Sequence, residues 1–275
     1  MNINHSRNSY FIKPTDFLVP ILLISVIAVF LYFNGVLTAH QYAEFQVNWF
    51  FYINATLSQF PAIIYNLTQL GDALICLSLL TIFIVYKPKI WEQLPSALIV
   101  SALLSSVLKN IFSVPRPAAV FDQTQFVIIG KTLTGHNSLP SGHSITLFTI
   151  LTVLLYVLMP KKKMQQWAWA FFIILVGLCL VFTRVGVGAH FPIDVISGSI
   201  VGYMSGLLGM FINQKYNLWA WIYNPKYYPF FMVLFVVCGG VIISKIIHEP
   251  LPIYYVSILM LLMSLYKITA IYVKK

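Results

Sequence analysis

Three short clusters in this sequence carry side chains suited to phosphate chemistry. Cations stabilise negative charge on phosphoryl oxygens, and a histidine beside a carboxylate can act as a base or a nucleophile. Only 9% of the chain is charged, and a charge near hydrocarbon is costly unless it is paired or solvated, so these side chains need a functional reason. The clusters are Lys109 with Arg116-Pro117, Pro140-Ser141-Gly142-His143, and Arg184 with His190 and Asp194.

The second cluster comes directly before an apolar run with the length of a helix. Ser141 is placed to cap that helix, and its unpaired first amides favour a phosphate. Gly142 lets the backbone approach a ligand closely, and His143 in the first turn could exchange a proton with it. An ordinary helix cap followed by an interfacial histidine is the alternative interpretation of this tetrapeptide.

The third cluster ends where another apolar run begins. Pro192 suits the first turn of a helix, and Asp194 in the same turn can reach back toward His190. A carboxylate in that position fixes the tautomer of a histidine and stabilises its cation. Alternatively, Asp194 is only a capping residue that benefits from the helix dipole.

Three cations, Lys109, Arg116 and Arg184, accompany these histidines. Phosphoryl transfer depends mainly on charge stabilisation of the transferred group, and arginine matches two phosphate oxygens with one planar fork. Taken singly, each of the three could instead be an interfacial side chain that extends its charge toward water.

The composition excludes an ordinary soluble domain, because 59% of the 275 residues are hydrophobic and only seven are acidic. The formal net charge of +10 is spread in twos and threes between apolar runs. We therefore interpret the basic residues as membrane-topology signals rather than a nucleic-acid surface. The cysteines, which all lie in apolar runs, are expected to be small buried hydrophobes: Cys76, Cys179 and Cys238.

Membrane-spanning helices need about 20 apolar residues, and the chain offers eight runs of roughly that length. The first begins at Phe17 with no small-residue cleavage site after it, so a retained helix is expected. We expect one all-α, integral-membrane domain over residues 1–275, a polytopic helix bundle. The predicted spans are 17–36, 62–86, 94–113, 141–159, 167–185, 193–213, 229–247 and 251–272.

Topology follows from the basic residues. An even number of spans puts both termini on one side, and most lysines and arginines fall on that side. The termini are therefore expected to be cytoplasmic, with all three clusters at the outer end of the bundle. Four-residue steps of small side chains predict packing faces on the helices that carry Asp194 and Lys109; they are Gly198, Gly202 and Gly206, and Ser101 and Ser105.

Other polar or aromatic residues are less specific. Residues 40–59 read as an interfacial aromatic helix, or as a loop packed on the bundle, and carry no assigned chemistry. Asp72, in a predicted span, is a functional candidate or a structural partner of one of the three cations. Lys131 and His136 precede the second cluster and could touch a headgroup or only water.

Together the clusters resemble the signature of the type 2 phosphatidic acid phosphatase (PAP2) superfamily. Its first motif, Lys, six residues, Arg-Pro, and its second, Pro-Ser-Gly-His, are complete. Its third, Ser-Arg, five residues, His, three residues, Asp, departs only at Thr183, which keeps a hydroxyl. The resemblance covers about residues 60–213. It implies a six-helix core, which leaves residues 229–272 as an additional helix pair of unassigned role.

This resemblance implies a mechanism without metal or cofactor. His190 would attack phosphorus, Asp194 would orient it, and His143 would protonate the leaving oxygen and then activate water. Lys109, Arg116, Ser141, the Gly142 amide and Arg184 would hold the phosphoryl oxygens.

The predicted function is therefore hydrolysis of a lipid phosphate monoester or diphosphate in a membrane, expected to be a bacterial inner membrane, with the site facing the periplasm or exterior. Undecaprenyl diphosphate is the first candidate substrate, followed by phosphatidylglycerol phosphate, phosphatidic acid and lipid A 1-phosphate. Two alternatives are transfer of the phosphoryl group to a second lipid and a lipid transporter without catalysis. Expected partners are the substrate and membrane lipids, not nucleic acid.

Overall fold

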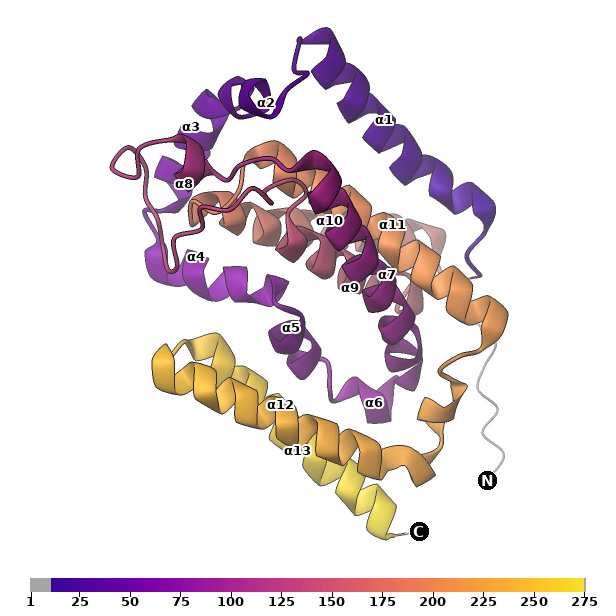
Figure 1. Ribbon diagram of the computed structural model, residues 1–275. Helices are drawn as coiled ribbons and strands as arrows, with labels where there is room; N and C mark the ends of the chain where they lie inside the picture. The colour runs from indigo at the N-terminus through magenta and orange to yellow at the C-terminus, as the bar shows by residue number, and fades with distance from the viewer. Residues whose placement is uncertain (1–10, 275) are drawn as a thin grey trace.

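The computed structural model describes residues 11–274, and all regular secondary structure in that range is helical (Figure 1). Six helices are long and apolar enough to cross a membrane, so the chain is an integral membrane protein. They are α1 (Leu18–Phe33, preceded by η1, Pro14–Phe17), α7 (Pro88–Phe112), α10 (Lys163–Gly186), α11 (Pro192–Tyr216), α12 (Tyr228–His248) and α13 (Pro252–Val273).

The predicted continuous span over 62–86 is wrong. This stretch forms α4 (Pro61–Thr68), η2 (Gln69–Gly71), α5 (Ala73–Leu79) and α6 (Phe83–Tyr86), with a bend of 86° at Asp72. The backbone of Asp72 is extended, and its carboxylate accepts a hydrogen bond from the Leu74 amide, so it ends one helix and caps the next. Counted as one broken span, the pair brings the candidate spans of full length among the described residues to seven, apart from the shorter apolar helix over Gly142–Val157.

The predicted span over 141–159 is a shorter helix, α9 (Gly142–Val157), with 16 residues. Most of its residues are buried, and it packs against both α7 and α11 (Figure 1). An apolar helix surrounded by other helices does not need full membrane length, because its backbone and side chains are covered by protein. α9 is therefore the central helix of the bundle.

Close helix approach at small residues sets this packing, as the four-residue steps predict. A Cβ atom on Gly202 would lie 2.4 Å from the Ile145 carbonyl oxygen, and one on Gly206 would lie 2.6 Å from the Thr152 Cβ. Both distances are too short for any side chain, so α9 and α11 touch backbone to backbone. On α7, Ser101 is buried in the same core.

The aromatic segment over 40–59 is helical and covers one end of the bundle. It forms α2 (Ala39–Phe45) and α3 (Val47–Leu57), beside the short α8 (Pro117–Val120). Phe50 is fully buried against the rings of Phe121, Phe126 and Phe191, whereas Trp49 is exposed. The segment thus packs on the loops at the end where α11 begins, which is called the site end below.

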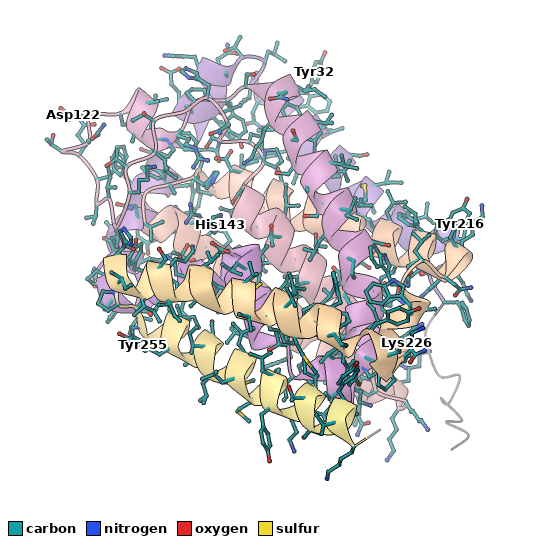
Figure 2. The ribbon with its side chains drawn as sticks, turned by 60° about the horizontal axis from the view of Figure 1, so that its bottom comes forward. Tyr32, Asp122, His143, Tyr216, Lys226 and Tyr255 are labelled. Atoms are coloured by element: carbon teal, nitrogen blue, oxygen red, sulfur yellow. The ribbon has the colours of Figure 1, made fainter. Side chains whose placement is uncertain are left out.

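The last two long helices form a hairpin beside the bundle (Figures 1 and 2). After η3 (Ala220–Tyr223) and η4 (Pro225–Tyr227), α12 and α13 pack on each other and on α5. Their buried side chains belong to a second hydrophobic cluster that also includes Ile75, Ile84 and Trp91. Among the cysteines, all free, Cys76 is buried as expected, whereas Cys179 is exposed on the surface of α10.

Candidate active site

His190 and Asp194 meet at the start of α11. Pro192 is the first residue of this helix, and the Asp194 carboxylate caps it by accepting the Phe191 amide at 2.9 Å. The same oxygen, Oδ2, lies 3.4 Å from Nδ1 of His190. Both side chains are almost completely buried. The capping role and the histidine-orienting role, treated as alternatives from the sequence, are therefore combined in one carboxylate.

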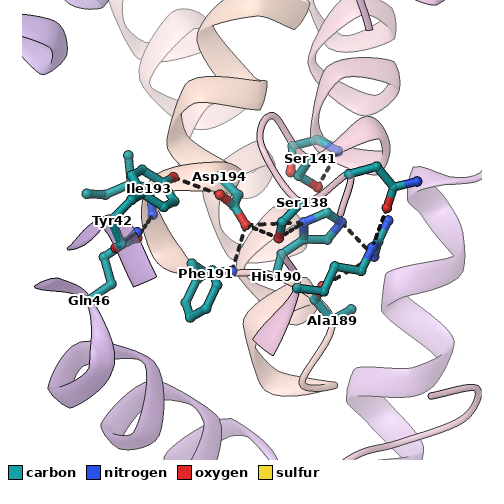
Figure 3. Close-up of polar contacts among 12 residues, drawn as sticks. Tyr42, Gln46, Ser138, Ser141, Ala189, His190, Phe191, Ile193 and Asp194 are labelled. Atoms are coloured by element: carbon teal, nitrogen blue, oxygen red, sulfur yellow. Dashed lines mark hydrogen bonds and ion pairs between the residues drawn. The ribbon is translucent and has the colours of Figure 1, made fainter. Parts of the chain in front are cut away.

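Two hydroxyl groups complete the surroundings of Asp194 (Figure 3). Tyr42 of α2 donates to Oδ1 at 2.7 Å, and Ser138 donates to Oδ2 at 2.5 Å while lying 3.4 Å from Nδ1 of His190. Sequence reasoning missed both. Tyr42 lies 152 residues away in a segment with no motif, and only the proximity of Ser138 to the second cluster offered a signal.

Arg116 contacts the other side of the His190 ring. Its Nη1 lies 3.3 Å from Nε2 of His190 and 3.3 Å from the Ala189 carbonyl oxygen, and its Nε donates to Asn137 at 2.8 Å. A guanidinium can only donate hydrogen bonds. Nε2 must therefore be the unprotonated acceptor, which places the ring proton on Nδ1, toward Asp194.

The charge state of His190 follows from the same surroundings. Burial lowers the pKa of His190 well below its ordinary value, and the positive charges of Arg116, Arg184 and Lys109 lower it further. The imidazole is therefore neutral at neutral pH, with an unprotonated Nε2 that faces Arg116. This is the form that can act as a nucleophile or base.

Arg184 and Lys109 lie beside this ring with few partners. Arg184 is buried; its Nη1 donates to Thr68 at 3.1 Å, while its Nε has no partner among the described residues. Within the described range, no hydrogen bond or ion pair holds the Lys109 ammonium, which lies 3.1 Å from the position of a Cβ built on Gly142. A buried donor without a partner is expensive to keep, so the Arg184 Nε, together with the half-buried Lys109 ammonium, is available to a ligand.

The second cluster closes the site from α9. Ser141 is the N-cap of this helix, as predicted, and its hydroxyl accepts the Ser144 amide at 3.4 Å. The Ser141 amide in turn donates to the Asp194 carbonyl oxygen at 3.0 Å. Ser141 therefore ties α9 to α11, while its hydroxyl, which accepts the Ser144 amide, can still donate its own hydrogen. His143, in the first turn, packs directly on Gly71, where a Cβ would lie 2.6 Å from its own Cβ.

The other residues singled out in the sequence do not join the site around His190. Asp72 pairs with Lys245 of α12 at 2.9 Å, so its partner is a cation outside the three clusters. Thr183 donates to the Leu180 carbonyl oxygen in its own helix, which turns this hydroxyl away from ligands. His136 is exposed, whereas Lys131 borders a pocket that also involves α12. The described residues contain no group of three metal-ligating side chains; independence from metal stays a prediction.

The arrangement brings the three sequence clusters to one end of the bundle. A neutral, oriented imidazole stands among three cations with a single carboxylate, Asp194, beside it. The cations of such a site can bind a tetrahedral anion, and the imidazole is placed to attack the central atom of that anion. The fold and site thus define a membrane protein built for phosphoryl chemistry.

Comparison with known proteins places the chain in a family. The sequence model of the PAP2 superfamily matches residues 92–218. Lipid A 1-phosphatase of Rhizobium etli is 30% identical over 174 aligned positions, and the alignment covers 55% of this chain and 71% of that protein. The chain therefore belongs to the PAP2 superfamily, a family of membrane lipid phosphatases. The match to the family's sequence model begins after α4 to α6 and ends before α12.

Further relatives match over shorter stretches. Lipid A 1-phosphatase of Rhizobium johnstonii is 34% identical over 43% of this chain and 46% of its own length. Bacitracin transport permease protein BcrC of Bacillus licheniformis is 27% identical over 40% of this chain and 49% of its own length. The chain thus spans about half of each. The crystal structure of Aquifex aeolicus LpxE is 25% identical, covers 60% of this chain and 94% of that one, and has a TM-score of 0.49.

Proposed function

We propose that this protein hydrolyses a phosphate monoester or diphosphate on a lipid through a phosphohistidine at His190. The observation that carries the proposal is the orientation of the ring: Nδ1 faces Asp194 and Nε2 faces Arg116. Binding alone requires neither a buried carboxylate behind the imidazole nor a fixed tautomer, whereas a nucleophile requires both.

In the first step, the electron pair on Nε2 of His190 attacks phosphorus, and the bond from phosphorus to the lipid oxygen breaks. His143 donates a proton to that oxygen, and Asp194 stabilises the positive charge on the imidazole. In the second step, His143 takes a proton from water, whose oxygen displaces Nε2 from phosphorus and releases inorganic phosphate. Five groups stabilise the phosphoryl oxygens throughout: Lys109, Arg116, Arg184, the Ser141 hydroxyl and the Gly142 amide.

The substrate would reach the site from the membrane, with its tail among the apolar helices. On topology grounds we place the site on the periplasmic or outer face of a bacterial inner membrane, with cytoplasmic termini. Undecaprenyl diphosphate remains a candidate from the sequence. The names of two relatives favour a second candidate, lipid A 1-phosphate, in which the phosphate is attached to a sugar.

Two other functions give different observable products. A phosphotransferase would use the same phosphohistidine but pass the group to a second lipid, so free phosphate would fall when acceptor is added. A transporter, which the name of the BcrC relative suggests, would move lipid without releasing phosphate. In that case His190→Ala should keep most of the function.

The test is release of inorganic phosphate by the purified protein in detergent with excess EDTA, across a panel of lipid monophosphates and diphosphates. We expect metal-independent release, and loss of about 10³-fold or more in His190→Ala. His40→Ala is the matched control, because this histidine is exposed and pairs only with Glu44 on the surface of α2. Full activity of His190→Ala, or no release from any lipid, would contradict the proposal.

A second measurement identifies the intermediate. Rapid quenching with radiolabelled substrate should leave phosphate on His190 in a bond that survives base and breaks in acid. Mass spectrometry then locates the modified residue. Label on any other residue would overturn the assignment of the nucleophile even if phosphate is released.

A further inference from the structure

A second polar pocket lies between α4 and the hairpin of α12 and α13. Its volume is about 440 Å³, a size that accommodates a small ligand. Most of its lining lies outside the stretch that matches the PAP2 superfamily, so the pocket belongs to parts added around the common core. The lining residues are Tyr65, Gln69, Lys131, Ser244, Lys245, His248, Glu249 and Tyr254.

One turn of chain separates this pocket from the candidate active site. Thr68 accepts the hydrogen bond from Arg184, and Gly71 packs on His143. In the same turn, Gln69 accepts from Tyr254 at 3.1 Å and Asp72 pairs with Lys245 at 2.9 Å. The turn therefore contacts the phosphate-binding side chains on one side and the hairpin on the other.

The distance along this wall is short. Tyr65 precedes Gln69 by one helical turn, and the side-chain amide of Gln69 donates to the Tyr65 carbonyl oxygen. Thr68, which accepts from Arg184, directly precedes Gln69 in the pocket lining. A group bonded to a phosphate beside Arg184 would therefore lie next to the pocket.

The charge of the pocket differs from that of the active site. Lys245 is neutralised by Asp72, and Glu249 accepts from the Tyr65 hydroxyl at 2.6 Å. With Lys131, the pocket and its immediate partners hold two ammonium groups against two carboxylates. A second phosphate would require uncompensated cations, which this balance does not supply.

Its chemistry instead suits a neutral group with many hydroxyls. The lining offers acceptors on Glu249 and a donor on Lys131, beside the ring of Tyr65. The Ser244 hydroxyl can do both, and His248, whose Nδ1 donates to the Ser244 carbonyl oxygen, offers Nε2 as a further acceptor. We propose that this pocket is a subsite for a sugar headgroup attached to the phosphate that His190 attacks. The inference rests on the proposed function, and it favours a phosphorylated glycolipid over a polyprenyl diphosphate as substrate.

The test compares the equilibrium binding of three soluble probes: inorganic phosphate, pyrophosphate and glucose 1-phosphate. The protein is kept in an amine-oxide detergent, because sugar-based detergents would compete. We expect glucose 1-phosphate to bind about tenfold more tightly than inorganic phosphate. Glu249→Ala should remove most of this advantage and leave the dissociation constant for inorganic phosphate unchanged. Lys267→Ala, an exposed change on α13 away from the pocket, should alter neither constant.

Equal binding of inorganic phosphate and glucose 1-phosphate by the unmodified protein would overturn the subsite. So would an equal effect of Glu249→Ala on both probes. Tight pyrophosphate binding that weakens in Lys131→Ala would also overturn it, in favour of a second phosphate in the pocket. The proposed function fails separately: it requires phosphate release from a lipid, which is measured in the same preparation whatever sugar the pocket prefers.

Discussion

Two buried carboxylates stand at opposite ends of the same helix bundle, and each is held by a tyrosine hydroxyl. At the site end, Asp194 accepts from Tyr42 at 2.7 Å. At the other end, Glu92 of α7 accepts from Tyr223 at 2.5 Å. Lys109 lies 17 residues beyond Glu92 on the same helix, a rise of about 25 Å at 1.5 Å per residue. The two sites are therefore far apart along the bundle.

Their charges differ. Around Glu92, Lys89 supplies one ammonium at 2.9 Å, and the amides of Gln93 and Asn213 donate to the same oxygen, so the carboxylate is matched within the protein. Around Asp194, three cations outnumber one carboxylate, and the nearest side chain is a neutral histidine. A matched network stabilises the fold, whereas an unmatched excess of cations, two of them buried, favours the binding of an anion.

The largest expected effect is that of Asp194→Asn. The amide is nearly the same size and can still accept from the Phe191 amide, so the helix cap and fold should persist. It cannot stabilise the His190 cation or enforce the Nδ1–H tautomer. We expect phosphate release to fall about 10³- to 10⁴-fold, with the melting temperature nearly unchanged. Retention of more than a tenth of the activity would place the orienting function elsewhere.

A smaller loss is expected for Tyr42→Phe, which removes only the hydroxyl that supports Oδ1 of Asp194. A hydrogen bond to a charged group contributes about 1.5–3 kcal/mol, and about 1.4 kcal/mol corresponds to a factor of ten. The value of kcat/KM for phosphate release should therefore fall about 10- to 100-fold, because the carboxylate is less firmly held behind His190. Unchanged kcat/KM would show that Ser138 and the Phe191 amide hold it sufficiently.

The sequence predicts contacts between residues that are close along the chain, but not contacts between distant segments. The pairing of His190 with Asp194 and the cap at Ser141 are local, since each follows from spacing near a helix start. Tyr42 and Ser138 reach Asp194 from separate segments, so neither helical periodicity nor a sequence motif connects these two residues with Asp194. Apolar content alone predicts a continuous helix and does not reveal the bend at Asp72, although a Gly-Asp pair offers both a break and a cap.

Tyr223→Phe is the matched change at the other end, and its effect on activity should be the smallest. It leaves Oε2 of Glu92 without its tyrosine donor, while Oε1 keeps Lys89, Gln93 and Asn213. A buried polar atom that loses its partner costs about 1–3 kcal/mol, so the melting temperature in detergent should fall by several degrees. Phosphate release per folded molecule should stay within about twofold, since no altered contact reaches His190.

Melting curves and initial rates on one preparation of each tyrosine variant test the contrast between Tyr223→Phe and Tyr42→Phe. A drop in kcat/KM for Tyr223→Phe as large as that for Tyr42→Phe would mean that the two ends are coupled through α7 and α11, and that the matched network also tunes the active site.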